Sequence, residues 1–227
     1  MCIANLVEYK NFGWNFFTLS FFMVFFSLIA EAVGFLEQIK TIKIKNSHKA
    51  LSLSMYLYFI FLFLSSLVYG AKIYSVLLML NGLLFVFCSK IAYELIKRKG
   101  INKKEFLLFI FCFIAILLMI ILPIKEIVFS VFMLGSIFAL LLQVFEIFKE
   151  KSPGVVEIKL ISIYFLTTLF FVWYAKITKD DLLILATVLT LFSLSIIILF
   201  WLYFYLKEKR GDDYESSISN TENRQKI

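Results

Sequence analysis

The sequence predicts an all-α membrane protein with seven transmembrane helices, arranged as two parallel three-helix bundles joined by a linker helix (3+1+3). Two observations support this fold class. Of the 227 residues, 62% are hydrophobic and only 17% are charged, whereas soluble domains carry about 25% charged residues. The apolar residues also fall into separate long runs, and the pattern of the first three runs returns after the fourth.

The seven apolar runs are separated by charged or polar residues. About 20 apolar residues cross a bilayer as a helix, so each run predicts one span. The first run continues past Glu31 without a cleavage region and therefore predicts a retained helix, not a signal peptide. After the last span the chain is polar, which predicts a disordered tail. The expected spans are residues 13–38, 50–70, 73–95, 106–122, 126–147, 157–175 and 181–206.

The chain contains an internal repeat. A shift of 105 residues aligns the segments around spans 1 and 2 with those around spans 5 and 6 without a gap. After one inserted residue, Asn81 of span 3 aligns with Thr187 of span 7. Among the aligned positions are Gln38 with Gln143, Ser47 with Ser152, Tyr69 with Tyr174, and Gly70 with Ala175.

Small residues four apart support the same alignment. Ala30 and Gly34 align with Gly135 and Ala139, and such pairs let helix backbones approach closely in lipid. A unit of three spans reverses the direction of the chain, so two units are parallel only if one more span lies between them. Span 4, Phe106 to Leu122, is apolar all round, as expected for a linking helix that largely faces lipid.

This repeat divides the chain into five parts. Two of them are the three-helix bundles, which the linker helix connects. The remaining parts are the two ends of the chain. The expected parts are an extracytoplasmic N-terminal segment (1–12), a first bundle (13–96), a basic loop with the linker helix (97–125), a second bundle (126–207) and a disordered cytoplasmic tail (208–227).

The distribution of lysine and arginine predicts the orientation. Fifteen of them lie in the loops after spans 1, 3 and 5 and at the end of span 7, against five on the opposite side. Cytoplasmic loops carry the excess of positive charge, so we expect the N-terminus outside and the C-terminus in the cytoplasm of a plasma membrane. The five on the outer side are Lys10, Lys72, Lys125, Lys176 and Lys179.

Composition and motifs argue against several function classes. The net charge of +7 comes from loops beside membrane spans and not from a nucleic-acid-binding patch. One histidine and three scattered cysteines do not form a metal site. The sequence has no Ser/His/Asp set, P-loop or dinucleotide motif. We therefore expect neither an enzyme nor a cofactor.

The 3+1+3 plan, the glutamine near the end of span 1 and the Lys/Ser segment after it resemble the SWEET sugar transporters and their half-size bacterial relatives in the PQ-loop group. The resemblance covers about residues 30–209. It is most marked at Met55-Tyr56, at "SSLVYG" (Ser65 to Gly70) and at Asn81-Gly82. The chain departs from the family in having Glu37 and Leu142 where the family has proline.

The resemblance implies a transporter of a small neutral polar solute, most simply a mono- or disaccharide. Transport would proceed by alternating access as facilitated diffusion. The partners would be the sugar and the lipid bilayer, and a second copy of the chain is a further candidate. The alternatives are a Pnu-type vitamin transporter, which has the same plan, and a PQ-loop receptor or sorting protein.

The substrate-binding candidates are Asn81, Thr187, Ser66 and Phe171. A carboxamide offers two donors and an acceptor, which suits a pair of sugar hydroxyls; the alternative for Asn81 is an interhelical hydrogen bond. Thr187 aligns with Asn81, and a threonine also commonly bonds its own helix backbone. Ser66 and Phe171 match the family's second pocket layer, and the alternative for Phe171 is packing.

Three further polar residues lie in apolar spans. Gln38 and Gln143 are interpreted as a hinge or gate, because a side-chain amide can bond backbone carbonyls that lipid would leave unsatisfied. The alternative is that each amide simply reaches the interface. Glu31 is a candidate proton site, since an intramembrane carboxylate usually faces a cavity or a polar partner. Its alternative role is structural, as a protonated and hydrogen-bonded side chain.

Overall fold

The computed structural model describes residues 6–224, with the side chains of residues 6–181 and 183–210. All of its regular elements in this part of the chain are α-helices. Their bounds are α1 (Val7–Asn11), α2 (Phe16–Lys45), α3 (Leu53–Ile73), α4 (Val76–Leu83), α5 (Phe85–Lys99), α6 (Lys103–Ile121), α7 (Lys125–Glu150), α8 (Ile158–Thr178) and α9 (Asp181–Arg224).

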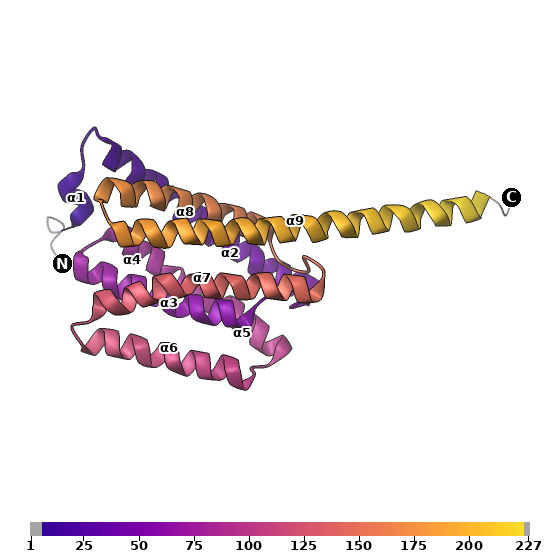
Figure 1. The fold of residues 1–227 in the computed structure, drawn as a ribbon, viewed down its shortest axis with the longest axis horizontal. Helices are drawn as coiled ribbons and strands as arrows, with labels where there is room; N and C mark the ends of the chain where they lie inside the picture. Colours follow the sequence, from indigo (N-terminus) through magenta and orange to yellow (C-terminus); the bar gives the residue numbers. More distant parts are fainter. Residues whose placement is uncertain (1–5, 225–227) are drawn as a thin grey trace.

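Within the described residues, seven helical spans are long and apolar enough to cross a membrane, which confirms the predicted number. The third span consists of α4 and α5, which are separated by a single turn at Leu84. Figure 1 shows the spans side by side, with α1 at one end of the bundle and the long C-terminal half of α9 projecting from the other. We call these the α1 end and the tail end.

The helices form two bundles with the same internal order. In the first, α2 packs against α5, and α3 packs against α4 and α5; in the second, α7 and α8 both pack against α9. The bundles meet through α2 against α8 and through α3 against α7, which are equivalent pairs under the repeat. The linker α6 packs on α3 and α7 at one side (Figure 1).

Two glycines explain the close packing of α3 on the third span. A Cβ at Gly82 would lie 2.6 Å from the backbone nitrogen of Leu67, and one at Gly70 would lie 2.9 Å from the backbone nitrogen of Met79. Because only glycine permits this approach, the sequence pairs "YG" and "NG" bring the two helix backbones together. The contact places Asn81 beside α3.

Polar ties join the two bundles at the tail end. Gln38 of α2 donates from Nε2 to the Val155 carbonyl (2.8 Å), and its Oε1 accepts from the amide of Glu157 (2.8 Å). Gln143 of α7 makes the equivalent bonds to the loop before α3. Its Nε2 donates to the Ala50 carbonyl (2.5 Å), and its Oε1 accepts from the Ser52 amide (3.1 Å). We call these four bonds the glutamine ties.

The ties differ from the sequence interpretation in one respect. We expected each amide to bond carbonyls freed in a loosened helix, yet α2 continues through Gln38 as a regular helix. The acceptors instead lie in the loop of the opposite bundle. The physical reason is that those loop backbone groups are buried and need a hydrogen-bond partner, which the glutamine of the opposite bundle supplies.

The N-terminal helix α1 is fixed to the start of α4 by one carboxylate. Glu8 is buried and accepts hydrogen bonds from the Ser75 hydroxyl (2.7 Å) and from the amides of Val76 (3.0 Å) and Leu77 (3.2 Å). These amides belong to the first turn of α4, where a negative charge is favoured. The sequence had indicated only an extracytoplasmic segment here, and residues 1–5 of that segment lie outside the described part.

Two helices extend beyond their expected ends. The first span was expected to end near residue 38, but α2 runs to Lys45, because Ile39 and Ile42 continue its buried face while Lys40, Lys43 and Lys45 are exposed. The seventh span was expected to end near 206 and to be followed by disorder from 208. In the structure α9 continues to Arg224, and residues 207–224 contain no proline that would end a helix.

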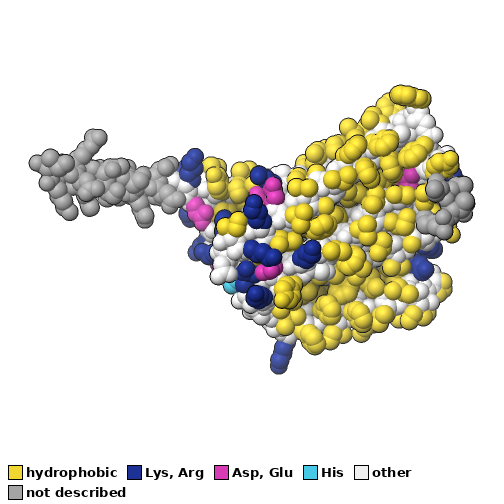
Figure 2. All heavy atoms as spheres, turned by 180° about the vertical axis from the view of Figure 1, so that it is seen from behind, with side chains coloured by type: hydrophobic (Ala, Val, Ile, Leu, Met, Phe, Trp, Pro, Cys, Tyr) yellow, Lys and Arg dark blue, Asp and Glu magenta, His cyan; other side chains and the backbone are white. Residues whose placement is uncertain are grey.

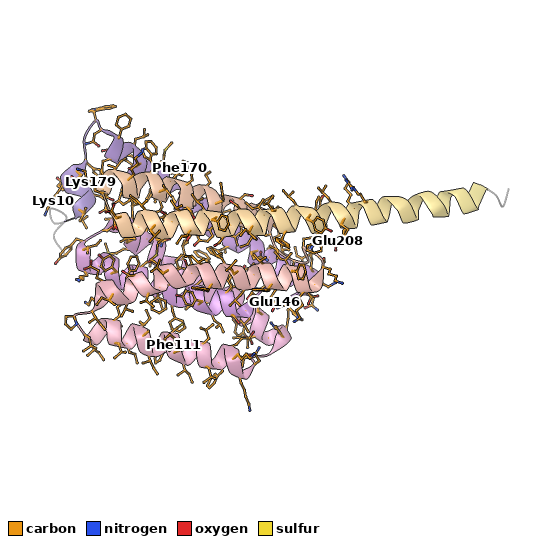
Figure 3. The ribbon with its side chains drawn as sticks, in the orientation of Figure 1. Lys10, Phe111, Glu146, Phe170, Lys179 and Glu208 are labelled. Atoms are coloured by element: carbon orange, nitrogen blue, oxygen red, sulfur yellow. The ribbon has the colours of Figure 1, made fainter. Side chains whose placement is uncertain are left out.

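The surface separates into an apolar belt and charged ends. Figure 2 shows hydrophobic side chains over most of the bundle and a concentration of lysine and arginine at the tail end. In Figure 3, Lys10 and Lys179 lie at the α1 end, and Glu146 and Glu208 lie at the tail end, while Phe111 points outward from α6. The molecule therefore has the shape and surface of an integral membrane protein.

The glutamine ties predict a stability effect. Replacing Gln38 by leucine leaves the buried Val155 carbonyl and Glu157 amide without partners, at a cost of about 1–3 kcal/mol for each group. We expect a clear drop in the thermal unfolding midpoint of the detergent-purified protein. Gln143→Leu should give a similar drop, because its bonds are equivalent.

The neighbouring Glu37 supplies the control. It is more exposed and pairs with Lys159 at 3.6 Å, and such exposed ion pairs contribute about 0–1 kcal/mol. Glu37→Gln should leave the midpoint almost unchanged. A Gln38→Leu protein as stable as the Glu37→Gln protein would contradict the importance of the ties.

Candidate functional site

A cavity of about 50 Å³ lies between the two bundles. Helices α3 and α4 form one wall, and α7, α8 and α9 form the other. We call it the hydroxyl cavity, because seven of its side chains are Ser, Thr or Tyr. Its lining residues are Leu62, Phe63, Ser66, Leu78, Asn81, Met133, Ser136, Tyr164, Thr167, Thr168, Phe171, Leu183, Thr187 and Thr190.

All four substrate-binding candidates from the sequence line this cavity. Asn81 donates from Nδ2 to the Ser66 hydroxyl at 3.4 Å, so α3 and α4 present these two side chains together. Thr187 bonds the Leu183 carbonyl of its own helix at 2.6 Å. Phe171 is buried and lies edge-on to Tyr174, with ring centroids 6.5 Å apart. The repeat alignment had placed these residues at equivalent positions, and the fold brings them together.

Further hydroxyl groups were missed by the sequence interpretation. They come from Ser136, Tyr164, Thr167, Thr168 and Thr190, all in the second bundle. The signal was present in the alignment, where Thr167-Thr168 stand opposite Leu62-Phe63 of the first repeat. Polar residues that replace apolar ones at repeat-equivalent positions of a buried helix indicate a site.

The hydroxyl groups are prearranged as acceptors. Ser136, Thr167, Thr168 and Thr190 each donate to a carbonyl of their own helix, at 2.6, 2.9, 2.7 and 2.8 Å. A hydroxyl that donates its hydrogen to the backbone keeps lone pairs for a ligand. The cavity wall therefore offers several acceptor oxygens beside one carboxamide, which suits a ligand with many O–H donors.

The cavity is electrically neutral. None of its described lining side chains carries a formal charge. A charged ligand in such a place would lack a counter-charge after losing its water, and that loss costs several kcal/mol. The arrangement consequently favours neutral polar ligands over cations or anions.

Glu31 lies outside this cavity. Its side chain is fully buried on α2, and neither carboxyl oxygen has a hydrogen-bond partner among the described residues. It does not line either of the cavities between the bundles. The repeat-equivalent residue, Ser136, does line the hydroxyl cavity, so the two repeats differ at this position.

A second cavity of about 40 Å³ lies toward the tail end, and we call it the apolar cavity. Gln38 and Gln143 both border it, so the glutamine ties close this side of the interface. At the α1 end a recess of about 60 Å³ shares Met133 and Leu183 with the hydroxyl cavity. Two carboxyl side chains, Glu126 and Asp180, line that recess.

Comparison with known proteins supports the fold. The chain matches no protein-family model and no curated protein by sequence. Among solved structures it is similar to a eukaryotic SWEET transporter determined at 3.7 Å resolution. The TM-score is 0.55 at 18% sequence identity, and the match covers 82% of this chain and 99% of the other. The chain therefore has a SWEET-like fold with seven membrane-span helices.

Proposed function

We propose that this protein is a membrane transporter for a small neutral solute rich in hydroxyl groups, most simply a mono- or disaccharide. The observation that supports it best is the uncharged, acceptor-rich hydroxyl cavity between two repeats of a SWEET-like fold. Transporters with internal repeats bind their solutes near the midplane at the interface between the repeats. Asn81, Ser66, Thr187 and Phe171 are the proposed contacts.

The mechanism that fits this geometry is alternating access by facilitated diffusion. A cavity of about 50 Å³ holds only a few water molecules, at roughly 10–15 Å³ each, and is smaller than a sugar. Loading therefore requires the two bundles to separate at one end. The glutamine ties act as the gate at the tail end, and their release opens that end of the interface.

Uptake into liposomes tests the proposal directly. Purified protein is reconstituted and offered radiolabelled sugars, vitamins and amino acids, with empty liposomes as the control. Saturable uptake of a sugar that equilibrates without an ion gradient supports the proposal. Uptake of a vitamin alone would favour the Pnu-type alternative. Binding of a ligand without any uptake would favour a receptor or sorting protein.

We propose an orientation with the α1 end outside the cell and the tail end in the cytoplasm of the plasma membrane. Lysine and arginine concentrate at the tail end (Figure 2), as expected for a cytoplasmic face. A reporter fused after Arg210 should therefore read as cytoplasmic, and a tag placed before Asn5 should react with an antibody added to intact cells. Both termini on one side would contradict the seven-span arrangement.

Asn81→Ala should reduce transport strongly without loss of folding. The substitution leaves a solute hydroxyl unpaired in a dry site, which costs about 1–3 kcal/mol and corresponds to roughly a fivefold to 150-fold loss. The measurement is initial uptake rate against solute concentration. Leu83→Ala, at an exposed position just after Asn81 in α4, is the matched control and should transport normally.

Thr187→Ala tests the asymmetry between the repeats. Its hydroxyl already donates to the helix backbone, so it offers a solute fewer bonds than an amide, and the loss should be smaller than at Asn81. Equal losses at the two positions would contradict this difference. Unchanged kinetics in a folded Asn81→Ala protein would remove that residue from the site.

Glu31→Gln distinguishes a facilitator from a proton symporter. Since Glu31 lines neither cavity, we expect the variant to retain transport and uptake to be insensitive to an imposed pH gradient. The measurement compares uptake into liposomes with and without that gradient. Solute accumulation driven by the gradient, and lost in Glu31→Gln, would instead make Glu31 the proton site.

A further inference from the structure

The hydroxyl cavity and the apolar cavity are consecutive spaces between the two bundles. The first contains Asn81 and lies nearer the α1 end; the second is bordered by the glutamine ties. One side chain, Tyr164 of α8, lines both cavities. A solute that moves from one end of the interface to the other has to pass this residue.

Tyr164 meets its own repeat equivalent. A shift of 105 residues places Phe59 of α3 at the same position, and the two rings pack edge to face with centroids 6.0 Å apart and planes at 80°. Residues related by the repeat touch where its pseudo-twofold axis runs. The ring pair therefore stands between the bundles at the axis and separates the two cavities.

The two partners are not chemically equal. Phe59 is buried, with 3% of its surface exposed, and it lines only the apolar cavity. Tyr164 is only partly buried and borders both cavities. Tyr164 also adds a phenol hydroxyl, which can both donate and accept a hydrogen bond.

We propose that Tyr164 is the central gate of the transport path and the residue that limits the size of the solute. Its ring, held by Phe59, closes the passage in this conformation, and its hydroxyl offers the solute a partner during the crossing. The ring has to turn away from Phe59 before a solute can enter the apolar cavity. This inference rests on the proposed transport function.

Thiol labelling tests the gate without a known solute. In a background with Cys2, Cys88 and Cys112 replaced by alanine, Leu194→Cys places a thiol in the apolar cavity, and Ser66→Cys places one in the hydroxyl cavity. A membrane-impermeant maleimide is applied to each face of the membrane in turn. The comparison uses the membrane face from which the maleimide labels Ser66→Cys faster. Applied to that face, the maleimide should label Leu194→Cys slowly while Tyr164 is present.

Removing the ring should open the passage. Adding Tyr164→Ala, or the bulkier Tyr164→Val if the alanine variant fails to fold, should raise the Leu194→Cys labelling rate about tenfold or more, because the ring no longer gates the path. Tyr164→Phe keeps the ring and should label slowly. Tyr93→Ala, which removes a tyrosine that is 65% exposed on α5, is the matched control and should also label slowly.

Transport kinetics test the hydroxyl. With the sugar identified by the uptake experiment, Tyr164→Phe should raise KM about fivefold, the equivalent of one neutral hydrogen bond, and Tyr164→Ala should admit larger sugars. Equal labelling rates with and without the ring would overturn the gate. Absence of transport by the native protein would overturn the proposed function instead, while the labelling comparison would still decide whether Tyr164 separates the cavities.

Discussion

Each bundle satisfies buried backbone groups of the other through one glutamine, and the rest of the interface depends on this exchange. The loops before α3 and α8 contain Ala50 and Val155, which are each 2% exposed, and their carbonyls have to find partners inside the protein. Gln38 and Gln143 supply them across the repeat. The bundles are consequently held together at the tail end, and the hydroxyl cavity lies farther toward the α1 end.

The internal repeat determines how the helices pack, and the differences between its two halves determine which polar groups line the hydroxyl cavity. Glycines and other small residues at repeat positions allow the close helix contacts, as where Gly34 packs on Leu160 of α8. The polar atoms do not follow the symmetry. The first bundle contributes Ser66 and Asn81, whereas the second contributes most of the hydroxyls, including Thr167 and Thr168. A pocket with one amide side and one hydroxyl side can orient an asymmetric solute, which a strictly symmetric pocket could not.

The sequence predicts the parts of this structure that depend on local composition or on the repeat. Long apolar runs give the seven spans, and the alignment of Asn81 with Thr187 brings the site candidates to one place. The sequence could not identify the Val155 carbonyl as the partner of Gln38, because Val155 lies 117 residues away in a loop. Nor could it predict the cap that Glu8 forms on α4, since an isolated glutamate before a span carries no pattern. The sequence did not predict the ends of α2 at Lys45 and of α9 at Arg224. An apolar run marks only the membrane-spanning part of a helix, and the helix can continue through charged residues beyond it.

The two ends of the interface differ in the kind of contact that closes them. At the tail end the four hydrogen bonds of the glutamine ties reach buried backbone groups, and each group left unpaired costs about 1–3 kcal/mol. At the α1 end the repeat-equivalent residues Tyr69 and Tyr174 pack on rings of the opposite bundle. Tyr69 stacks on Phe129 at 4.6 Å, and Tyr174 lies 5.7 Å from Phe17.

Aromatic contacts of this kind add about 0.5–1.5 kcal/mol each beyond the apolar area that they bury. The tail end is therefore closed by directional hydrogen bonds to backbone groups, and the α1 end by ring packing. The hydroxyl cavity is closer to the end with ring packing, and the glutamine ties border the apolar cavity at the opposite end.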